Sequence, residues 1–394
     1  MFRRVMKITA VATLLVTTFG TGVEGSVVRP NEAPIFTKVA GGLIHTCAIT
    51  TTKVLYCWGG NWYGQLGTGD SNPVEGKHLV QGDLAGKEVV DISLGQGHTC
   101  ALTSEGIVYC WGDGGPWVGS GTTDMLYEPH AVIGGSLNGT FVTNVDAGNW
   151  NTCANTYSGF SCWGENSSYQ IHLENPIDNR PYPVIMNQGV FSRGEVTDFS
   201  VGENLICAVV IAKVACSGDD LKEVLLPEFV RGGYLRSKQV TSVAAGTHTC
   251  AITTLGTVAC WGHNTRGQLG DGTVEDRVIP RRVNSGALTN VLVEQIEASE
   301  EGTCAVTTRG KLACWGFNTD GQVGNGSIDT QPIPTLVNTG ALRRKTVISV
   351  GMGELHTCAI TQAGRIACWG DNAYGQLGDG TTNDSRRPKF IAWE

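Results

Sequence analysis

The sequence has no excess of basic residues, which limits the partners that it can have. Lysine and arginine total 28 against 36 aspartates and glutamates, so the formal net charge of the 394-residue chain is −8 at pH 7. A protein that binds nucleic acid through the phosphates carries a basic surface and usually a basic balance. We therefore expect a partner other than nucleic acid.

Catalytic and metal-binding motifs are also missing. The chain contains no G-x-S-x-G, H-E-x-x-H or G-x-x-x-x-G-K-[ST] motif, and no C-x₂-C pair of the kind that binds zinc. An enzyme with its site on a central axis would need several carboxylates that converge there, and the acidic residues show no such period. The sequence predicts a protein that is not an enzyme and that has no cofactor and no metal.

Long apolar runs are absent except near the N-terminus. Basic residues in the first seven positions precede an apolar stretch over residues 8–23, and small residues follow up to Gly25. This order predicts a cleaved secretory signal peptide at residues 1–25. An uncleaved anchor helix is the alternative, but the stretch is short and rich in threonine for a membrane span. We expect the mature chain, residues 26–394, to be secreted, monomeric and without a membrane span.

Cysteine, in contrast, is abundant and recurs with a period. The fourteen cysteines form seven pairs, nine or ten residues apart, and successive pairs are separated by 43–54 residues. Six of the seven pairs are followed by Trp-Gly, and no cysteine is left over. A fixed period of this length indicates a repeat architecture. The pairs are Cys47 with Cys57, Cys100 with Cys110, Cys153 with Cys162, Cys207 with Cys216, Cys250 with Cys260, Cys304 with Cys314, and Cys358 with Cys368.

Each unit predicts about four short strands. In "CALTSEGIVYC" two apolar segments flank a three-residue loop that ends in Gly106, as in a hairpin with a glycine bulge. Lys53 stands at this position in the first unit. Strands without charge on either face belong inside a stack of sheets. We therefore predict an all-β, seven-bladed β-propeller of four-stranded antiparallel blades. An open solenoid is the alternative, but its end units would be polar caps.

The paired cysteines suit this arrangement, because the two ends of a hairpin face each other across the ladder. Their Cβ atoms can then reach the separation that a disulfide needs. An exported protein meets an oxidising environment. We expect one intra-blade disulfide in each blade.

The glycine-rich tails that follow Cys-Trp-Gly give a family resemblance. The tails "WGGNWYGQLGTG", "WGHNTRGQLGDG", "WGFNTDGQVGNG" and "WGDNAYGQLGDG", together with the preceding H-T-C-A-[LI]-T segments, resemble the regulator of chromosome condensation repeat over essentially the whole mature chain. The resemblance implies a seven-bladed propeller with a ring-closing terminal strand. It also implies an alternative function, guanine-nucleotide exchange on a small GTPase, because the nuclear members of the family are exchange factors. The export signal and the cross-linked blades depart from that nuclear type.

Positions that break the period are candidates for partner binding, since aromatic and charged loop residues favour protein contacts. The loops of units 2, 3 and 4 also lose the Gly-Gln-Leu-Gly tail, and drift in tolerant loops is the competing explanation. We predict a secreted propeller scaffold that binds a protein through its loops. An exported enzyme or enzyme inhibitor that uses a propeller face is a second alternative. The candidate contacts are Trp62, Tyr63, Trp117, Trp150, Glu300 and Glu301.

Two further sets of residues have a predicted role. His45, His98, His248 and His356 lie two residues before a cysteine, and we expect each to fix the turn into its strand through a hydrogen bond rather than to bind metal. Asn-x-Ser/Thr sequences are glycan acceptors in a eukaryotic secretory pathway. The candidate acceptors are Asn138, Asn166, Asn325 and Asn383.

Overall fold

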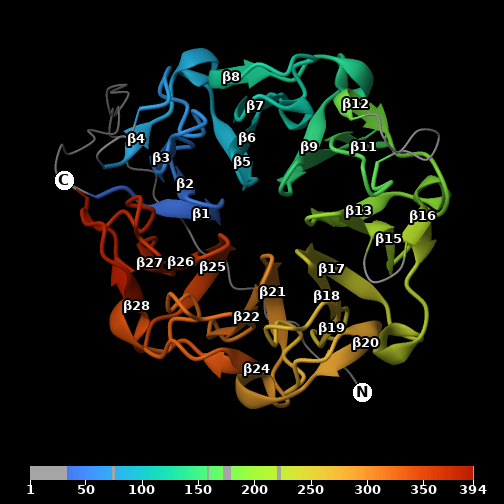
Figure 1. Ribbon diagram of the computed structural model, residues 1–394, viewed down its shortest axis with the longest axis vertical. Helices are drawn as coiled ribbons and strands as arrows, with labels where there is room; N and C mark the ends of the chain where they lie inside the picture. The colour runs from blue at the N-terminus through green and yellow to red at the C-terminus, as the bar shows by residue number, and fades with distance from the viewer. Residues whose placement is uncertain (1–32, 73–75, 158, 172–178, 220–222, 394) are drawn as a thin grey trace, which may run out of the picture. The chain divides into compact units, whose positions relative to one another are not determined.

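A computed structural model of the chain describes residues 33–393, except 73–75, 158, 172–178 and 220–222. The predicted signal peptide, residues 1–25, lies outside the described residues. Seven four-stranded antiparallel sheets are arranged around a central axis, so the fold is the predicted seven-bladed β-propeller (Figure 1). Each blade uses four strands that are consecutive in the sequence, and the first strand of each lies nearest the axis.

The second and third strands of the blades contain most of the buried positions, whereas the first strands alternate between buried and accessible ones. The second strands are buried at every position in six of the seven blades. The first strands are β1 (Phe36–Gly41), β5 (Val89–Leu94), β9 (Val142–Ala147), β13 (Val196–Val201), β17 (Val240–Ala245), β21 (Val293–Ala298) and β25 (Val347–Met352). The second strands are β2 (His45–Thr50), β6 (His98–Thr103), β10 (Asn151–Thr156), β14 (Leu205–Val210), β18 (His248–Thr253), β22 (Gly302–Thr307) and β26 (His356–Thr361).

The third and fourth strands complete each blade toward the rim. The third strands are β3 (Leu55–Gly59), β7 (Val108–Gly112), β11 (Gly159–Gly164), β15 (Lys213–Asp219), β19 (Val258–Gly262), β23 (Leu312–Gly316) and β27 (Ile366–Gly370). The fourth strands are β4 (His78–Leu79), β8 (Leu126–Ala131), β12 (Arg180–Ile185), β16 (Glu223–Phe229), β20 (Arg277–Val283), β24 (Gln331–Leu336) and β28 (Ser385–Phe390). Single turns of 3₁₀ helix lie in the connections: η1 (Gly82–Leu84), η2 (Pro116–Val118), η3 (Gly135–Leu137), η4 (Phe191–Arg193), η5 (Gly233–Leu235), η6 (Gly286–Leu288) and η7 (Gly340–Leu342).

The fourteen cysteines form the seven predicted disulfides, one in each blade. In every case the two cysteines are directly paired across the second and third strands, for example Cys100 with Cys110. The hairpin loops explain why this register is reached. Gly106 takes the left-handed conformation that the three-residue loop needs, and Lys53 adopts it in blade 1 with φ of 64°. The disulfide therefore follows from the loop length.

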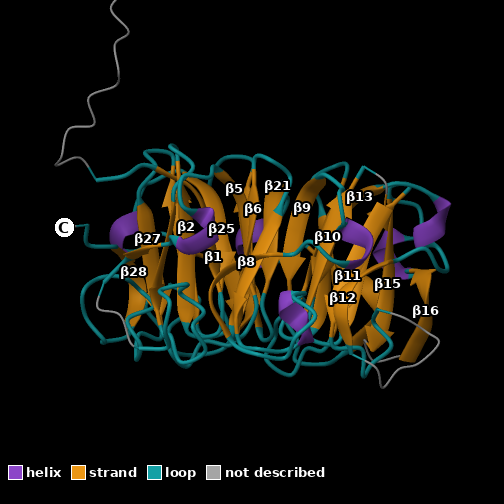
Figure 2. Cartoon of the chain, turned by 90° about the horizontal axis from the view of Figure 1, so that it is seen from above, coloured by secondary structure: helices purple, strands orange, loops and turns teal. Residues whose placement is uncertain are grey.

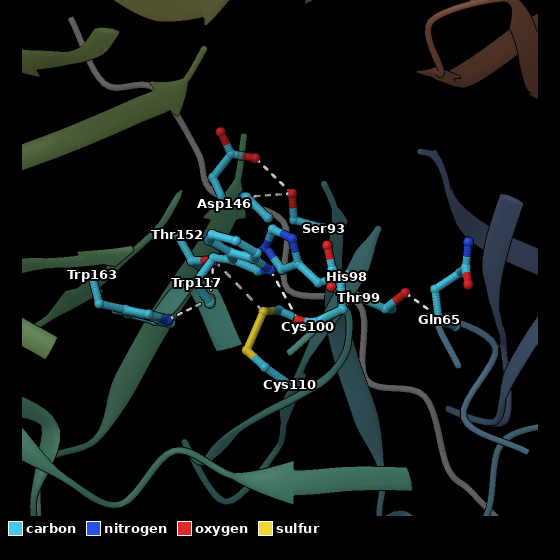
Figure 3. Close-up of a disulfide and its surroundings, with 12 residues drawn as sticks. Gln65, Ser93, His98, Thr99, Cys100, Cys110, Trp117, Asp146, Thr152 and Trp163 are labelled. Carbon is cyan, nitrogen blue, oxygen red and sulfur yellow. Dashed lines mark hydrogen bonds between the residues drawn. A yellow bond between two sulfur atoms is a disulfide. The ribbon is translucent and has the colours of Figure 1, made fainter. Parts of the chain in front are cut away.

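Neighbouring blades are joined by a repeated contact between side chains. Nε2 of His98 in blade 2 donates to Oγ1 of Thr152 in blade 3 over 3.0 Å. The Thr152 hydroxyl donates in turn to the carbonyl of Trp117, and Nε1 of Trp163 donates to the same carbonyl (Figure 3). The same His-to-Thr bond joins His45 to Thr99, His248 to Thr303 and His356 to Thr46.

These bonds correct the expected role of the histidines, because each side chain bonds the next blade and not its own turn. Burial lowers the pKa of His45, His98 and His248 to about 3 and that of His356 to about 4. The rings are therefore neutral at physiological pH. Since each threonine hydroxyl donates to a carbonyl, the histidine must be the donor through Nε2–H.

Within residues 33–393, the ring closes without the shared terminal strand that the family resemblance implied. β28 is the fourth strand of its own blade, and β1 is the first strand of blade 1. The backbone N–H of Phe36 donates to the Gly364 carbonyl of blade 7 over 2.9 Å. Aromatic side chains add to the closure: the Trp393 ring centroid lies 5.3 Å from that of Phe36 and 4.9 Å from that of Tyr56. The bond between His356 and Thr46 continues the inter-blade contact across the same junction.

Candidate protein-binding face

The turns of the blades lie on two faces of the ring, because neighbouring strands are antiparallel (Figure 2). The loop face carries the turns between first and second strands and the long loops between third and fourth strands. The hairpin face carries the hairpins between second and third strands and the connections between blades. All the residues predicted to contact a partner are on the loop face. Trp62, Tyr63 and Trp117 are in third-to-fourth loops, and Trp150, Glu300 and Glu301 are in first-to-second turns.

Trp62 is the most exposed of these aromatic residues, with 52% of its surface accessible. Its ring packs edge to face against Tyr374 of blade 7 at a centroid distance of 4.6 Å. The pair borders a groove of about 890 Å³ between blades 1 and 7, which is also lined by Asn61, Gly378 and Thr382. Two adjacent aromatic rings beside a groove form the kind of surface that anchors a protein partner.

The other aromatic candidates are more deeply packed. Tyr63 is half-buried and lies over Gly97 in the first turn of blade 2. Trp117 and Trp150 contact each other edge to face, with ring centroids 4.8 Å apart. Trp117 also packs on the hydrophobic cluster around the Cys100 disulfide, and its Nε1 donates to the Asp113 carbonyl. Trp117 therefore has a structural role in addition to its position on the loop face.

The first-to-second turns surround the mouth of the central channel, a cavity of about 80 Å³. Nε2 of Gln96 donates to the carboxylates of both Glu300 and Glu354, over 3.1 and 2.9 Å. Nδ2 of Asn149 donates to Glu300 as well. These residues come from blades 2, 3, 6 and 7, so hydrogen bonds span the mouth.

Carboxyl groups gather at this mouth. Burial and the neighbouring Glu300 carboxyl raise the pKa of Glu354 to about 8. Burial, with a contribution from Glu300, also raises the pKa of Glu203. The adjacent Glu301 differs, because it forms an ion pair with Arg266 at 3.1 Å. Glu354 therefore holds its proton at neutral pH, beside the carboxyl of Glu300.

Below the mouth, carboxylates do converge on the axis, which corrects our expectation from the sequence. Asp146 accepts hydrogen bonds from Ser93 and from the backbone N–H of Val201, so it links blades 2, 3 and 4. Burial raises the pKa of Asp146 to about 6 and that of Glu297 to about 7. Both line a channel cavity of about 210 Å³. Asp91 is paired with Lys38 of blade 1.

Asp146 and Asp198 are held by hydrogen bonds from the next blade, whereas Glu297 is held within its own strand, β21. Asp198 accepts from the Val243 backbone N–H at 2.8 Å, and Glu297 accepts from Gln295 at 2.9 Å. Hydrogen bonds occupy both carboxylate oxygens of Asp146. Among the described residues, no group of three or more His, Cys, Asp or Glu is placed to hold a metal ion. The structure also contains, in its described part, no helix with the length and hydrophobicity that a bilayer span needs.

Comparison with known proteins identifies the repeats. Two models of the "Regulator of chromosome condensation (RCC1) repeat" match the chain, one at residues 36–65, 89–115, 240–268, 293–322 and 347–376 and the other at 256–306, 309–360 and 363–394. The chain is 30% identical over 375 residues to the ultraviolet-B receptor UVR8 of Arabidopsis thaliana, an alignment that covers 90% of this chain and 81% of that protein. The chain belongs to the regulator of chromosome condensation repeat family.

Solved structures of proteins with low sequence identity to this chain share its fold. Human WBSCR16 superposes with a TM-score of 0.74 at 20% identity, covering 86% of this chain and 94% of that one. Prp20p of Saccharomyces cerevisiae, whose structure was described with its binding to Gsp1p and histones, gives a TM-score of 0.71 at 21% identity. That alignment covers 91% of this chain and 87% of that one.

The four candidate glycan acceptors of the chain differ in solvent accessibility. Asn138 and Asn383 are exposed, and Asn325 is half-buried. Asn166 is fully buried, and its Oδ1 accepts a hydrogen bond from the Ile171 backbone N–H over 2.8 Å. Because a glycan needs an accessible amide nitrogen, Asn138 and Asn383 are the positions where we expect one, and Asn166 is not.

Sequence reasoning missed several residues of the loop face, although the family repeat contained the signal. Tyr374 occupies the same repeat position as Tyr63, directly before Gly-Gln-Leu-Gly. Glu354 was missed because its own unit is otherwise regular. The repeat position of Glu354 is shared by the other residues around the channel mouth, so aligning the units would have revealed the ring. These residues are Leu43, Gln96, Asn149, Glu203 and Glu300.

Proposed function

We propose that this chain is a secreted, disulfide-locked propeller that has no catalytic activity of its own and binds another protein through its loop face. The observation that carries the proposal is the exposed pair of Trp62 and Tyr374 beside the groove between blades 1 and 7. The cross-linked blades support secretion, since disulfides persist in oxidising compartments. The rigid ring supports a scaffold role because its loops are held in fixed positions.

The site is tested by binding of the mature chain, residues 26–394, to partners captured from culture medium. A captured protein is purified and its affinity measured for the wild type and for the double variant Trp62→Ala/Tyr374→Ala. We expect the double variant to bind at least about tenfold more weakly, as for removal of interface anchors. The matched control removes two exposed apolar side chains from the hairpin face, Leu255→Ala and Leu292→Ala. An equal loss in the control, or none in the test variant, would place binding elsewhere.

Secretion is tested separately, so that its failure does not count against the loop face. The natural protein is isolated from medium and from cells, and its N-terminus is sequenced. We expect a chain in the medium that begins at Ser26 and contains no free thiol. A chain that stays in the cell with reduced cysteines would contradict secretion.

Guanine-nucleotide exchange is the second candidate, because the chain belongs to a repeat family that includes exchange factors. Its test is the release of labelled guanine nucleotide from purified small GTPases. We expect no acceleration by the oxidised chain. Release accelerated by the wild type, and lost in Trp62→Ala/Tyr374→Ala, would replace the scaffold proposal.

An enzyme in the channel is less well supported, although carboxylates converge there. A general acid or base needs an oxygen free to meet a substrate. Asp146 and Asp198 instead accept backbone N–H groups of the next blade. The arrangement supports a structural role for both carboxylates.

A further inference from the structure

The hairpin face contains a basic pocket where blades 4 and 5 meet. The pocket has a volume of about 380 Å³. Its floor is aliphatic, formed by Val214, Leu235 and Val240. Four cationic side chains line it, in a chain whose net charge is −8. They are Lys213, Arg231, Arg236 and Lys238.

Local structure brings these cations together from separate segments. Lys213 is the first residue of β15, and Arg231 follows the end of β16. The connection then turns sharply at Gly232 and Gly233, which have φ values of 94° and 53°. A Cβ at Gly233 would lie 2.3 Å from the Pro280 carbonyl oxygen, so only glycine lets the connection pack this closely on blade 5. Arg236, just after η5, is thereby brought to the same pocket.

The four cations of the pocket lack carboxylate partners among the described residues. Two of them lie over aromatic rings instead. Nζ of Lys213 is 5.7 Å from the Phe229 ring centroid, and Nζ of Lys238 is 5.6 Å from that of Tyr234. Unpaired like charges around one cavity repel each other, and a bound anion would relieve that repulsion.

The shape of the pocket narrows the class of anion. A volume of about 380 Å³ is in the range of small-molecule sites and exceeds what a single inorganic ion fills. The aliphatic floor suits the C–H face of a sugar ring, while the cationic rim suits its sulfate or carboxylate groups. Arg282 of blade 5, which also stacks on Tyr234 at 5.6 Å, extends the positive surface beyond the pocket. The extension fits a polymer that continues past one sugar unit.

Nucleic acid fits the pocket less well. Single-stranded binding relies on open aromatic faces on which bases stack, and the rings of Phe229 and Tyr234 are covered by cations. We propose that this pocket binds an acidic sugar unit of an anionic polysaccharide, at a site separate from the loop face.

The experiment measures binding of the disulfide-intact mature chain to defined oligosaccharides by calorimetry. The probes are a heparin-derived oligosaccharide, which carries sulfates, and an oligogalacturonate, which carries only carboxylates. Neutral dextran and a DNA duplex of similar charge are the comparison ligands. We expect at least one acidic oligosaccharide to bind, dextran not to bind, and DNA to bind at least about tenfold more weakly. Binding of the heparin-derived probe alone would identify sulfate as the recognised group, and binding of the oligogalacturonate would identify carboxylate.

Matched variants show whether the pocket itself is responsible. Arg236→Ala/Lys238→Ala removes two cations of the pocket, and we expect its affinity to fall at least about tenfold. Arg343→Ala/Lys345→Ala removes two exposed cations from the same face at the equivalent connection after η7, and we expect a change of at most about threefold. Circular dichroism confirms that both variants fold.

Three outcomes would overturn the proposal. The first is that neither acidic oligosaccharide binds. The second is that DNA binds as tightly as the better of the two oligosaccharides, which would indicate a general attraction of polyanions. An equal loss in the two double variants would show that the whole face attracts the ligand and that the pocket has no special role.

Discussion

Nε2 of His98 in blade 2 lies 3.0 Å from Oγ1 of Thr152 in blade 3, and the Thr152 hydroxyl lies 3.0 Å from the Trp117 carbonyl oxygen. A neutral imidazole, a hydroxyl and a loop carbonyl thus form a chain across the blade junction. The contact recurs at the junctions of blades 1 and 2, 5 and 6, and 7 and 1. The His-Thr-Cys segment that recurs in the repeats therefore lies at the contact between blades, and its histidine and threonine fix the relative position of neighbouring blades.

Replacing Thr152 with valine tests this contact. The change keeps the side-chain shape but leaves the buried Nε2–H of His98 without an acceptor, so we expect the free energy of unfolding to fall by about 1–3 kcal/mol. Thr357→Val is the control, because Thr357 also donates to a loop carbonyl, that of Gln322, but Gly302 stands where the histidine would be. We expect the control to lose about 1 kcal/mol at most. Urea unfolding measures both, and equal losses would show that the histidine contributes nothing.

The carboxyl pair at the channel mouth predicts a pH dependence of stability. The folded chain keeps a proton on Glu354 up to a pH of about 8, whereas the unfolded chain releases it near the ordinary value of 4.5. The folded state therefore binds more protons between these values, so the contribution of Glu354 is fully present below this window and is lost as pH rises through it. Buried Glu297 and Asp146 act in the same direction, since burial raises the pKa of both.

Glu354→Gln removes this proton release while keeping a polar side chain beside Gln96. We expect the melting temperature of the variant to fall less than that of the wild type between about pH 5 and about pH 8. Glu301→Gln is the control, because Glu301 is paired with Arg266 and not with another carboxyl. A Glu354→Gln variant that follows the wild-type curve throughout would contradict a raised pKa of Glu354.

The hairpin of blade 4 carries strain that a substitution can remove. Ile211 and Ala212 form its two-residue loop with φ values of 46° and 59°, a conformation that suits Asn-Gly and disfavours a β-branched residue. We expect Ile211→Asn/Ala212→Gly to raise the free energy of unfolding by about 1 kcal/mol. Leu255→Asn, at an exposed hairpin position of blade 5 without positive φ, should give no such gain. Denaturant midpoints compare the two, and an unchanged midpoint in the double variant would argue against strain.

Replacing Trp62 and replacing Trp117 should have different effects on partner binding and on the stability of the fold. Trp117 packs on the Cys100 cluster, so we expect Trp117→Ala to lower the free energy of unfolding by about 2 kcal/mol. Trp62 is half exposed, and Trp62→Ala should change it by less than about 0.5 kcal/mol while weakening partner binding. Thermal unfolding and affinity are measured on both variants. A large loss of stability in Trp62→Ala would make that residue unsuitable as a binding anchor.

The sequence by itself determined the blade. The period of the cysteine pairs, the hairpin loop that ends in Gly106 and the alternation of short apolar strands each depend on residues close together in the chain. Register across a hairpin is set by loop length, so the pairing of Cys100 with Cys110 could be predicted. The seven-bladed ring followed from counting such units.

Only the tertiary structure decided what lies between blades and around the axis. His98 meets Thr152 across more than fifty residues, and the meeting of Gln96 with Glu354 spans more than half the chain. Such contacts depend on how the ring closes and on which side of each strand faces the axis, and local spacing does not encode either. For the same reason, Asp146 and Glu297 came together in the channel although they are far apart in the chain. Each is the fifth residue of the first strand of its blade, and only the closed ring turns that shared position toward the axis.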